Sequence, residues 1–326
     1  MAVLVTGGAG YIGSHMTHVL GDLGEKVVVL DNLVTGIRGL VSPSAIFVEG
    51  SVADPILVGQ ILREHNIDSV IHFAGSVVVP ESVSDPIKYY QNNTSASCLL
   101  VDACIRHGVK NFIFSSTAAV YGMPDQSIVE ETQRLDPINP YGRSKLMTEW
   151  MLQDVAKASD LKFVILRYFN VAGADPKGRT GQSTANATHL IKRACQAALG
   201  RVDHLDIFGN DYPTPDGTGV RDYIHVMDLI AAHVLALQHL KDGGEPSIFN
   251  VGYGRGFSVR EVIGVTERVA GKAIPVRESA KRPGDPAMIV SNPARLRSRL
   301  NWQPQYDNLE TIVRSAYEWE RRLNRA

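Results

Sequence analysis

The sequence opens with Met1-Ala-Val-Leu-Val-Thr-Gly-Gly-Ala-Gly-Tyr-Ile-Gly13, an apolar run that stops at a glycine cluster. The following residues have the apolar spacing of a helix as far as Gly24, and 26–30 is a second apolar run. Strand, glycine turn, helix and strand in this order are the context that a dinucleotide-binding loop requires. The glycines let the backbone approach a pyrophosphate, while the helix N-terminus offers N–H groups and a partial positive charge.

Asp31 follows directly after the second run, eighteen residues beyond Gly13. A carboxylate at this place can accept hydrogen bonds from both ribose hydroxyls of the adenosine, and it repels a 2′-phosphate. The sequence therefore predicts NAD rather than NADP as the cofactor.

Strands and helices alternate through the first half of the chain. The expected strands are 2–6, 26–30, 45–48, 69–73, 111–114 and 161–166, and the expected helices between them include 56–64, 89–107 and 141–158. Small residues follow the strand at 69–73, and ligands bind at this edge of an open parallel sheet. The pattern predicts an α/β fold with a doubly wound parallel Rossmann sheet.

The alternation breaks near residue 171. Helices are expected at 190–199, 226–241, 258–270 and 309–324, with a strand at 248–251 and irregular stretches at 173–186, 209–219 and 282–286. We expect a cofactor-binding domain over 1–172, a smaller mixed α/β lobe over 173–326, and a return of about 224–251 to the first domain.

Bulk composition excludes several function classes. A formal net charge of −1 gives no electrostatic reason to expect nucleic acid or a membrane surface as a partner. Cys98, Cys104 and Cys195 have no paired spacing, so neither a disulfide framework nor a metal site is expected. No apolar run reaches membrane-spanning length and no signal peptide is evident, so we expect a cytoplasmic protein.

Tyr141 and Lys145 are the strongest chemical signal, because residues four apart share one helix face. Lowering a phenol pKa of 10 by three units requires roughly 4 kcal/mol of preferential phenolate stabilisation. One positive charge about 5 Å away, at an effective dielectric constant near 20, supplies roughly 3 kcal/mol. The pair can therefore make a base near neutrality only with an oxidised, cationic nicotinamide nearby.

The motifs together resemble the extended short-chain dehydrogenase/reductase family. They comprise Thr6-Gly-Gly-Ala-Gly-Tyr-Ile-Gly13, Asp31-Asn32, His72-Phe-Ala-Gly75, Ser115-Ser-Thr117 and Tyr141-x-x-x-Lys145. Within that family, the stretches 167–170, 207–214, 216–228 and 282–285 resemble the UDP-hexose 4-epimerases. The similarity covers essentially the whole chain.

The resemblance implies epimerisation at C4 of a UDP-hexose, with UDP-glucose and UDP-galactose as the first pair, and no net redox change. Tyr141 takes the proton of the 4-hydroxyl while C4 gives a hydride to NAD⁺; the 4-keto sugar then turns, and the hydride returns to its other face. Thr117 hydrogen-bonds the same oxygen, and Lys145 lowers the Tyr141 pKa and binds the nicotinamide ribose.

The resemblance also implies the binding residues. Those for NAD are Gly7, Gly10, Tyr11, Ile12, Gly13, Asp31, Asn32, Ser51, Val52, Phe73, Ala74, Gly75, Asn92, Ser115, Tyr141, Lys145 and Tyr168. Those for the UDP-sugar are Thr117, Tyr141, Asn170, His189, Leu190, Leu205, Asp206, Phe208, Arg221, Tyr223, Arg282 and Asp285. Asn170 and Arg221 would bind the diphosphate, Arg282 and Asp285 the diphosphate and uridine ribose, and 205–208 the uracil.

Three positions depart from the pattern of some family members. Ser51 replaces an aspartate that accepts the adenine amino group, and Val77 replaces a lysine near the cofactor phosphates. Ile289 lies where a bulky or small residue excludes or admits N-acetyl sugars, and its intermediate size leaves that choice open.

Alternative functions differ in what they require. A nucleotide-sugar 4,6-dehydratase needs an acidic pair where this chain has Ala118 and Ala119, so dehydration is disfavoured. Epimerases of N-acetylhexosamines, uronates or pentoses stay open, because the chemistry at C4 is the same. A non-catalytic NAD-sensing module is disfavoured because Thr117, Tyr141 and Lys145 are all retained.

A homodimer is also implied, because relatives form an intersubunit four-helix bundle from helices that correspond to 89–107 and 141–158. Both helices carry many apolar residues: Leu99, Leu100, Leu146, Met147 and Met151. We expect these to exceed what one sheet face can cover.

Overall fold

The computed structural model describes residues 2–185, 187–282 and 284–323, which form two compact units. Unit 1 comprises Met1–Val120, Leu135–Arg167 and Ile230–Phe249, and unit 2 comprises Tyr121–Arg134, Tyr168–Leu229 and Asn250–Ala326. Asn186, Pro283 and Asn324, which the sequence assigns to an irregular stretch, a turn and a helix, lie outside the described residues.

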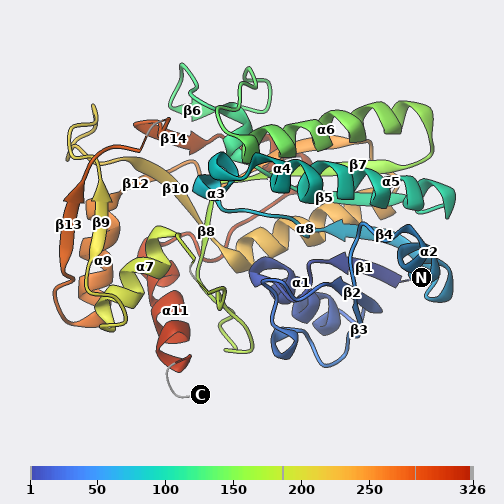
Figure 1. Ribbon diagram of the computed structural model, residues 1–326, viewed down its shortest axis with the longest axis horizontal. Helices are drawn as coiled ribbons and strands as arrows, with labels where there is room; N and C mark the ends of the chain where they lie inside the picture. The colour runs from blue at the N-terminus through green and yellow to red at the C-terminus, as the bar shows by residue number, and fades with distance from the viewer. Residues whose placement is uncertain (1, 186, 283, 324–326) are drawn as a thin grey trace. The chain divides into compact units, whose positions relative to one another are not determined.

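Unit 1 is built on a seven-stranded sheet with the order β11-β7-β5-β4-β1-β2-β3 (Figure 1). Its strands are β1 (Ala2–Thr6), β2 (Val27–Asp31), β3 (Ile46–Glu49), β4 (Ile67–His72), β5 (Asn111–Thr117), β7 (Lys162–Tyr168) and β11 (Ser247–Val251). The pairings from β3 through β5 are parallel. The order reverses direction between β1 and β4, which makes this the topological switch point where ligands bind in such sheets.

Helices pack on the sheet of unit 1 because its strands are apolar on both faces. These helices are α1 (Tyr11–Asp22), α2 (Pro55–Glu64), α3 (Val79–Ser84), α4 (Pro86–Tyr89), α5 (Ala96–Arg106) and α6 (Pro140–Ala158), with a 3₁₀ turn at Arg38–Leu40. One core cluster joins Leu4, Val70 and Phe112 of the strands to Ile61 of α2 and Leu100 of α5. Continuous burial of strand residues is typical of parallel sheets.

The expected helix 89–107 forms almost throughout, but its N-terminal part is not regular α-helix. A π-helical segment, Tyr90–Ser95, lies between α4 and α5. It is fixed by the buried His72, whose ring bonds to Thr6 Oγ1 at 2.7 Å and Ser97 Oγ at 2.8 Å. Since the Ser97 hydroxyl donates to Asn93 O at 2.5 Å, it accepts from the imidazole, and β1, β4 and this segment are linked.

Unit 2 contains a five-stranded mixed sheet of short strands, with the order β12-β10-β14-β6 and β8 paired to β10. Its strands are β6 (Ile128–Val129), β8 (Asn170–Ala172), β10 (Val220–His225), β12 (Gly256–Ser258) and β14 (Met288–Ser291), and β9 (Leu205–Phe208) pairs separately with β13 (Val276–Ser279). The helices are α7 (Leu190–Ala198), α9 (Val259–Ala270), α10 (Ala294–Leu300) and α11 (Leu309–Arg322); α8 (Val226–Lys241) has residues in both units, and a 3₁₀ turn spans Ala118–Tyr121.

The prediction of a doubly wound α/β sheet accompanied by a smaller mixed lobe is confirmed. All seven expected strands of the large sheet form within a few residues of their predicted limits. The short strands of unit 2 were missed, because two to six residues give no readable periodicity.

Replacing Leu20 by alanine should lower the free energy of unfolding by about 2–5 kcal/mol, since this α1 side chain is fully buried. The matched control is Leu23→Ala, three residues later and 59% exposed, which should change stability by less than about 0.5 kcal/mol. Chemical denaturation of the purified proteins measures both. Equal destabilisation by the two substitutions would contradict this packing.

Candidate active site

The glycine turn after β1 and the turn after β4 touch each other at the switch point. Gly7 has a φ of +68°, and a Cβ at this position would lie 2.6 Å from the backbone N of Ala74. Phe73 N donates to Thr6 O at 3.0 Å, which ties the ends of the two strands together. Only glycine permits this close approach.

The N-terminus of α1 is shaped for an anion. Its N-cap residue Gly10 makes no side-chain capping bond, and its first turn holds no acidic residue. By contrast, α2 and α6 are capped by Asp54 and Asn139. A Cβ on Gly13 would lie 2.1 Å from Gly7 O, so the turn and helix pack without room for a side chain. These residues, with Tyr11 and Ile12 in the first turn, fit a pyrophosphate.

Asp31 lies buried at the end of β2, facing the same turn. Its Oδ2 accepts from Ala9 N at 2.9 Å and its Oδ1 from Leu33 N at 2.8 Å. Each carboxylate oxygen has a second lone pair, so the group can still accept from two ribose hydroxyls. The neighbouring Asn32 accepts from Val34 N at 3.2 Å.

The other predicted cofactor residues lie in different settings. Ser51 Oγ accepts from Ala53 N at 3.1 Å, while Val52 packs in the core cluster. Asn92 Nδ2 donates to Ser76 Oγ at 3.1 Å, next to Gly75. The Phe73 ring lies 4.9 Å from that of His233. Tyr168 is a buried residue of unit 2.

Thr117, Tyr141 and Lys145 come together where α6 crosses the end of β5. The Thr117 hydroxyl hydrogen-bonds the Tyr141 phenol. Lys145 Nζ donates to Ser115 O at 2.9 Å and lies 5.0 Å from the centre of the Phe114 ring. A Cβ on Gly75 would lie 3.6 Å from Nζ, so this lysine borders the turn that follows β4.

Burial dominates the acid–base properties of this group. Burial raises the pKa of Tyr141 above its usual value, and the Thr117 hydrogen bond opposes that shift. Burial lowers the pKa of Lys145 to about 8, and the Glu149 carboxylate opposes that shift. The polypeptide alone therefore keeps the phenol protonated near neutrality, so the predicted deprotonation depends on a bound oxidised cofactor.

Two residues of this site were missed in the sequence. Asn93, in the π-helical segment, accepts from Ser76 N at 2.7 Å and donates to Ser144 Oγ at 3.0 Å. Glu149 continues the four-residue spacing of Tyr141 and Lys145, and that repetition was the available signal. No sequence pattern marks Asn93, because the π segment that directs it depends on tertiary contacts.

In unit 2, several predicted substrate residues are neighbours on β10. Tyr223 is paired with Asn170 of β8, and Arg221 with Ile289 of β14. The Arg221 guanidinium lies 3.6 Å from the Asp285 carboxylate. The cationic group and the residue at the variable pocket position are thus held side by side by strand pairing.

A second group lies along β9 and the turn at 282–285. The Arg282 guanidinium lies 3.7 Å from the centre of the Phe208 ring. Asp206 is engaged by Arg277 at 2.7 Å, and Leu205 packs into the core of unit 2. His189 Nδ1 bonds to Gln182 Nε2 at 2.9 Å, and burial lowers the His189 pKa.

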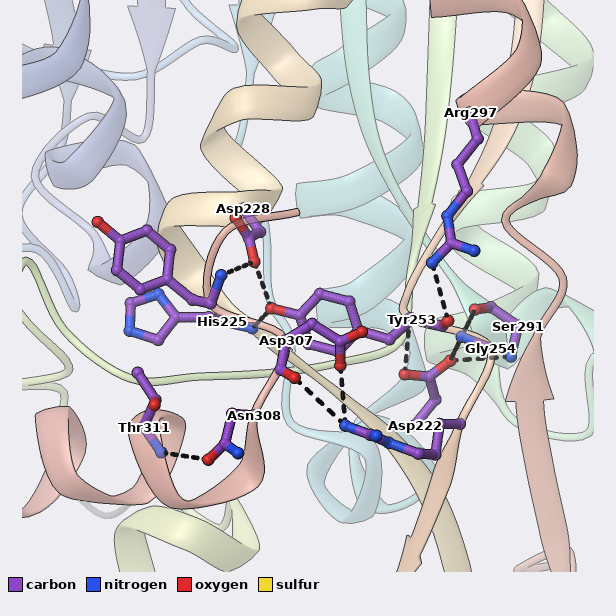
Figure 2. A network of polar contacts seen from close by, with 12 residues as sticks. Asp222, His225, Asp228, Tyr253, Gly254, Ser291, Arg297, Asp307, Asn308 and Thr311 are labelled. Atoms are coloured by element: carbon purple, nitrogen blue, oxygen red, sulfur yellow. Dashed lines mark hydrogen bonds and ion pairs between the residues drawn. The ribbon is translucent and has the colours of Figure 1, made fainter. Parts of the chain in front are cut away.

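Residues at the starts of α7 and α8 are anchored differently. Leu190, the first residue of α7, packs at the edge of the unit 2 core. Figure 2 shows the carboxylates of Asp222 and Asp228 at the centres of two hydrogen-bond clusters. Asp222 accepts from Ser291 Oγ at 2.6 Å, two residues beyond Ile289, and therefore fixes β14 against β10.

Asp228 binds the chain segment that precedes α11. It accepts from the Tyr253 hydroxyl at 2.5 Å (Figure 2). It also accepts from the backbone N of Gln305 and Tyr306. Burial raises the pKa of both Asp222 and Asp228, while their hydrogen bonds oppose the shift. These carboxylates thus organise the strand that carries Arg221.

Residues 2–185, 187–282 and 284–323 contain neither a candidate membrane span nor a candidate metal site. No helix in these ranges is both long and apolar enough to cross a bilayer. No group of three or more histidine, cysteine, aspartate or glutamate side chains there is arranged to hold a metal ion.

Comparison with known proteins identifies the family. Residues 3–252 match the profile of the NAD dependent epimerase/dehydratase family. The chain belongs to this family. The resemblance to extended short-chain dehydrogenases/reductases is thereby confirmed.

Family members with known names match along their whole length. UDP-glucose 4-epimerase of Azospirillum brasilense is 55% identical over 324 residues, which cover 99% of this chain and 93% of that protein. The crystal structure of UDP-glucose 4-epimerase from Brucella ovis in complex with NAD has a TM-score of 0.95 and 46% identity, with 97% of each chain covered. The enzyme of Bifidobacterium longum in complex with NAD⁺ and UDP has a TM-score of 0.94 and 37% identity, covering 99% of this chain and 98% of its own.

Gly13→Ala should impair cofactor retention, because the added methyl group meets a backbone carbonyl that cannot move freely. If the displaced turn costs the NAD complex about 1–3 kcal/mol, as overpacking typically costs a fold, NAD binds about five- to 150-fold more weakly. Gly39→Ala, with nothing near the added Cβ, is the control. Titration with NAD measures both, and unchanged affinity in Gly13→Ala would contradict the assignment.

Proposed function

We propose that this protein is an NAD-dependent UDP-hexose 4-epimerase that interconverts UDP-glucose and UDP-galactose. The proposal is carried by one observation, the meeting of Thr117, Tyr141 and Lys145 beside the Gly75 turn. It is supported by full-length relatives named UDP-glucose 4-epimerase at 55% and 47% identity. The reaction leaves no net redox change.

Unit 1 would bind NAD and unit 2 the nucleotide part of the substrate. The uncapped N-terminus of α1 would hold the pyrophosphate, and Asp31 the adenosine ribose. Asn32, Ser51, Val52, Phe73, Ala74, Asn92, Ser115 and Tyr168 would complete the cofactor site. When bound, NAD supplies a reversible hydride acceptor and, in its oxidised form, a positive charge.

Tyr141 would remove the proton of the sugar 4-hydroxyl and later return it. Lys145 would stabilise the phenolate by its charge, and the Thr117 hydroxyl would hydrogen-bond the same sugar oxygen and keep it next to the phenol. Because the polypeptide alone raises the Tyr141 pKa, base formation is coupled to the oxidised cofactor.

The diphosphate would lie against Asn170 and Arg221, and the uridine against Arg282, Asp285 and β9. Tyr223, His189 and Leu190 are proposed as further contacts. The nucleotide would stay fixed while the 4-keto sugar turns, which requires strong binding away from the reacting carbon.

The experiment that tests this function is incubation of the purified protein with a panel of UDP-sugars, followed by chromatographic separation of 4-epimers. UDP-glucose and UDP-galactose should interconvert, and bound NAD should show transient reduction. A panel with UDP-N-acetylhexosamines, UDP-uronates and UDP-pentoses decides among the 4-epimerases. Absence of any epimerisation would refute the proposal.

Tyr141→Phe should reduce kcat by about 10³-fold or more, because the phenol is the only acid–base group that the proposal gives to the 4-hydroxyl. Bound NAD, measured spectroscopically, should remain. Tyr317→Phe, a conservative change on α11, is the control with normal activity. Substantial epimerisation by the Tyr141 variant would rule out the mechanism.

We also propose a homodimer through α5 and α6. Leu100 and Leu146 do not contribute, contrary to expectation, because both are buried within the protomer. Leu99, Met147 and Trp150 are 40%, 42% and 54% exposed and supply the apolar surface instead. The free thiols of Cys98, Cys104 and Cys195 are consistent with a cytoplasmic location.

Sedimentation at micromolar concentration should report a dimer, and Trp150→Glu should shift it to the monomer because a buried charge at an interface is unfavourable. Lys272→Glu, an exposed change in unit 2, should leave the dimer intact. A monomeric parent protein would exclude this assembly.

A further inference from the structure

Glu149 is a buried carboxylate one helical turn beyond Lys145, and the proposed reaction gives it no task. Its side chain has no exposed surface. Tyr141, Lys145 and Glu149 are spaced by four residues on α6 and therefore share one face. A carboxylate is rarely buried unless it is paired, so the partners of Glu149 indicate its role.

The three residues on this face hold three successive residues at the end of β5. Tyr141 meets the Thr117 hydroxyl, and Lys145 donates to the Ser115 carbonyl. Glu149 accepts a short hydrogen bond from the Ser116 hydroxyl. Glu149 thereby fixes the register between α6 and the strand end that carries the proposed catalytic threonine.

Arg167 of β7 keeps this carboxylate in a fixed orientation. Its Nη2 lies 2.7 Å from Glu149 Oε2, and its Nε donates to Oε1 at 3.1 Å. The arginine side chain is only 2% exposed. A buried ion pair is seldom more stabilising than apolar packing of the same volume, so stability alone is a weak reason for it.

The surroundings of Lys145 make Glu149 electrostatically important. The groups that act on the ammonium or lie against it are Glu149 on α6, the Phe114 ring on β5 and His72 on β4, with Arg167 paired to Glu149. Burial lowers the pKa of His72 to about 3, so this imidazole is neutral. Among the described residues that shift the Lys145 pKa, Glu149 is the one anion.

We propose that Glu149 is a positioning residue for the epimerisation, one that keeps the Lys145 ammonium charged and residues 115–117 in register with α6. This inference rests on the proposed function. Phenol with neutral amine and phenolate with ammonium contain the same number of protons, and a negative charge beside the lysine favours the second form. Glu149 thus favours the form with phenolate and ammonium, which contains the base that the reaction needs.

Distance decides the sign of this effect. Glu149 lies four residues from Lys145 and eight from Tyr141, which correspond to about 6 Å and about 12 Å along the helix. Glu149 raises the Lys145 pKa, and it is not among the groups that shift the Tyr141 pKa, so its net effect favours the ammonium.

The test compares Glu149→Gln, Glu149→Asp and the double variant Glu149→Gln/Arg167→Met with the parent. The double variant removes both charges, so it supplies the result if the single glutamine variant fails to fold once Arg167 has lost this carboxylate. We expect both glutamine variants to retain bound NAD and an unchanged KM, and to lose about tenfold or more in kcat at pH 8. Their activity should also fall at a lower alkaline pH than that of the parent, because a lysine of lower pKa loses its charge at a lower pH. Glu149→Asp, which keeps the charge, should retain the parent alkaline limb.

A second readout is independent of activity. NMR titration of protein carrying ¹³C at the lysine Cε, with the Lys145 signal identified by its loss in Lys145→Met, should show the Lys145 pKa lowered by about one unit or more in the glutamine variants. An unchanged Lys145 titration and an unchanged pH profile of kcat in a folded variant would overturn the inference. If the parent epimerises no UDP-sugar yet Lys145 titrates lower in the variants, the proposed function fails while the coupling between Glu149 and Lys145 stands.

Discussion

The site depends on holding one ammonium charge in a place where water is excluded. Burial removes much of the hydration that stabilises Lys145, and its remaining partners are the Ser115 carbonyl, the Phe114 ring and, one turn away, Glu149. The pKa of such a buried lysine depends on neighbouring charges far more than the pKa of an exposed lysine does. Burial raises the Tyr141 pKa and lowers the Lys145 pKa, so in both residues it favours the uncharged form. The protonation states of phenol and amine are therefore considered together.

The strand order brings this pair to the cofactor side of the sheet. Because the order reverses between β1 and β4, the glycine turn of residue 7 and the turn of residues 73–75 are neighbours, and β5 comes next. Gly75 then lies against Lys145, with Asn93 bonded to Ser76. A dinucleotide site and an acid–base site at adjacent strand ends are what a hydride-transferring reaction requires. Unit 2 contributes a separate arrangement, in which buried Asp222 and Asp228 fix the strand that carries Arg221.

Features that depend on local sequence were predictable, whereas features that depend on contacts between distant residues were not. The large sheet was predictable, since each strand is a local apolar run and the turn residues carry their own signals, as Gly7 does. The interruption of the helix at Tyr90–Ser95 was not, because it depends on His72 and Ser97 meeting across the fold. Strands such as β6 and β8 form only through pairing with distant partners. Tyr141 and Lys145 were recognisable by spacing, whereas the importance of Glu149 emerges only with Ser116 and Arg167 in contact.

We propose that Tyr141 becomes a base because a lysine ammonium and an oxidised pyridinium act on it together. The direct measurement is an ultraviolet titration of tyrosinate in the parent protein and in Tyr141→Phe. The difference between the two curves gives the titration of Tyr141, and it is recorded first with the bound cofactor oxidised and then with it chemically reduced. The Tyr141 phenolate should form at a clearly lower pH with NAD⁺ bound than with NADH bound, because only the oxidised ring is cationic. A phenol still protonated above about pH 8 with NAD⁺ bound, or one that titrates identically in both states, would contradict it.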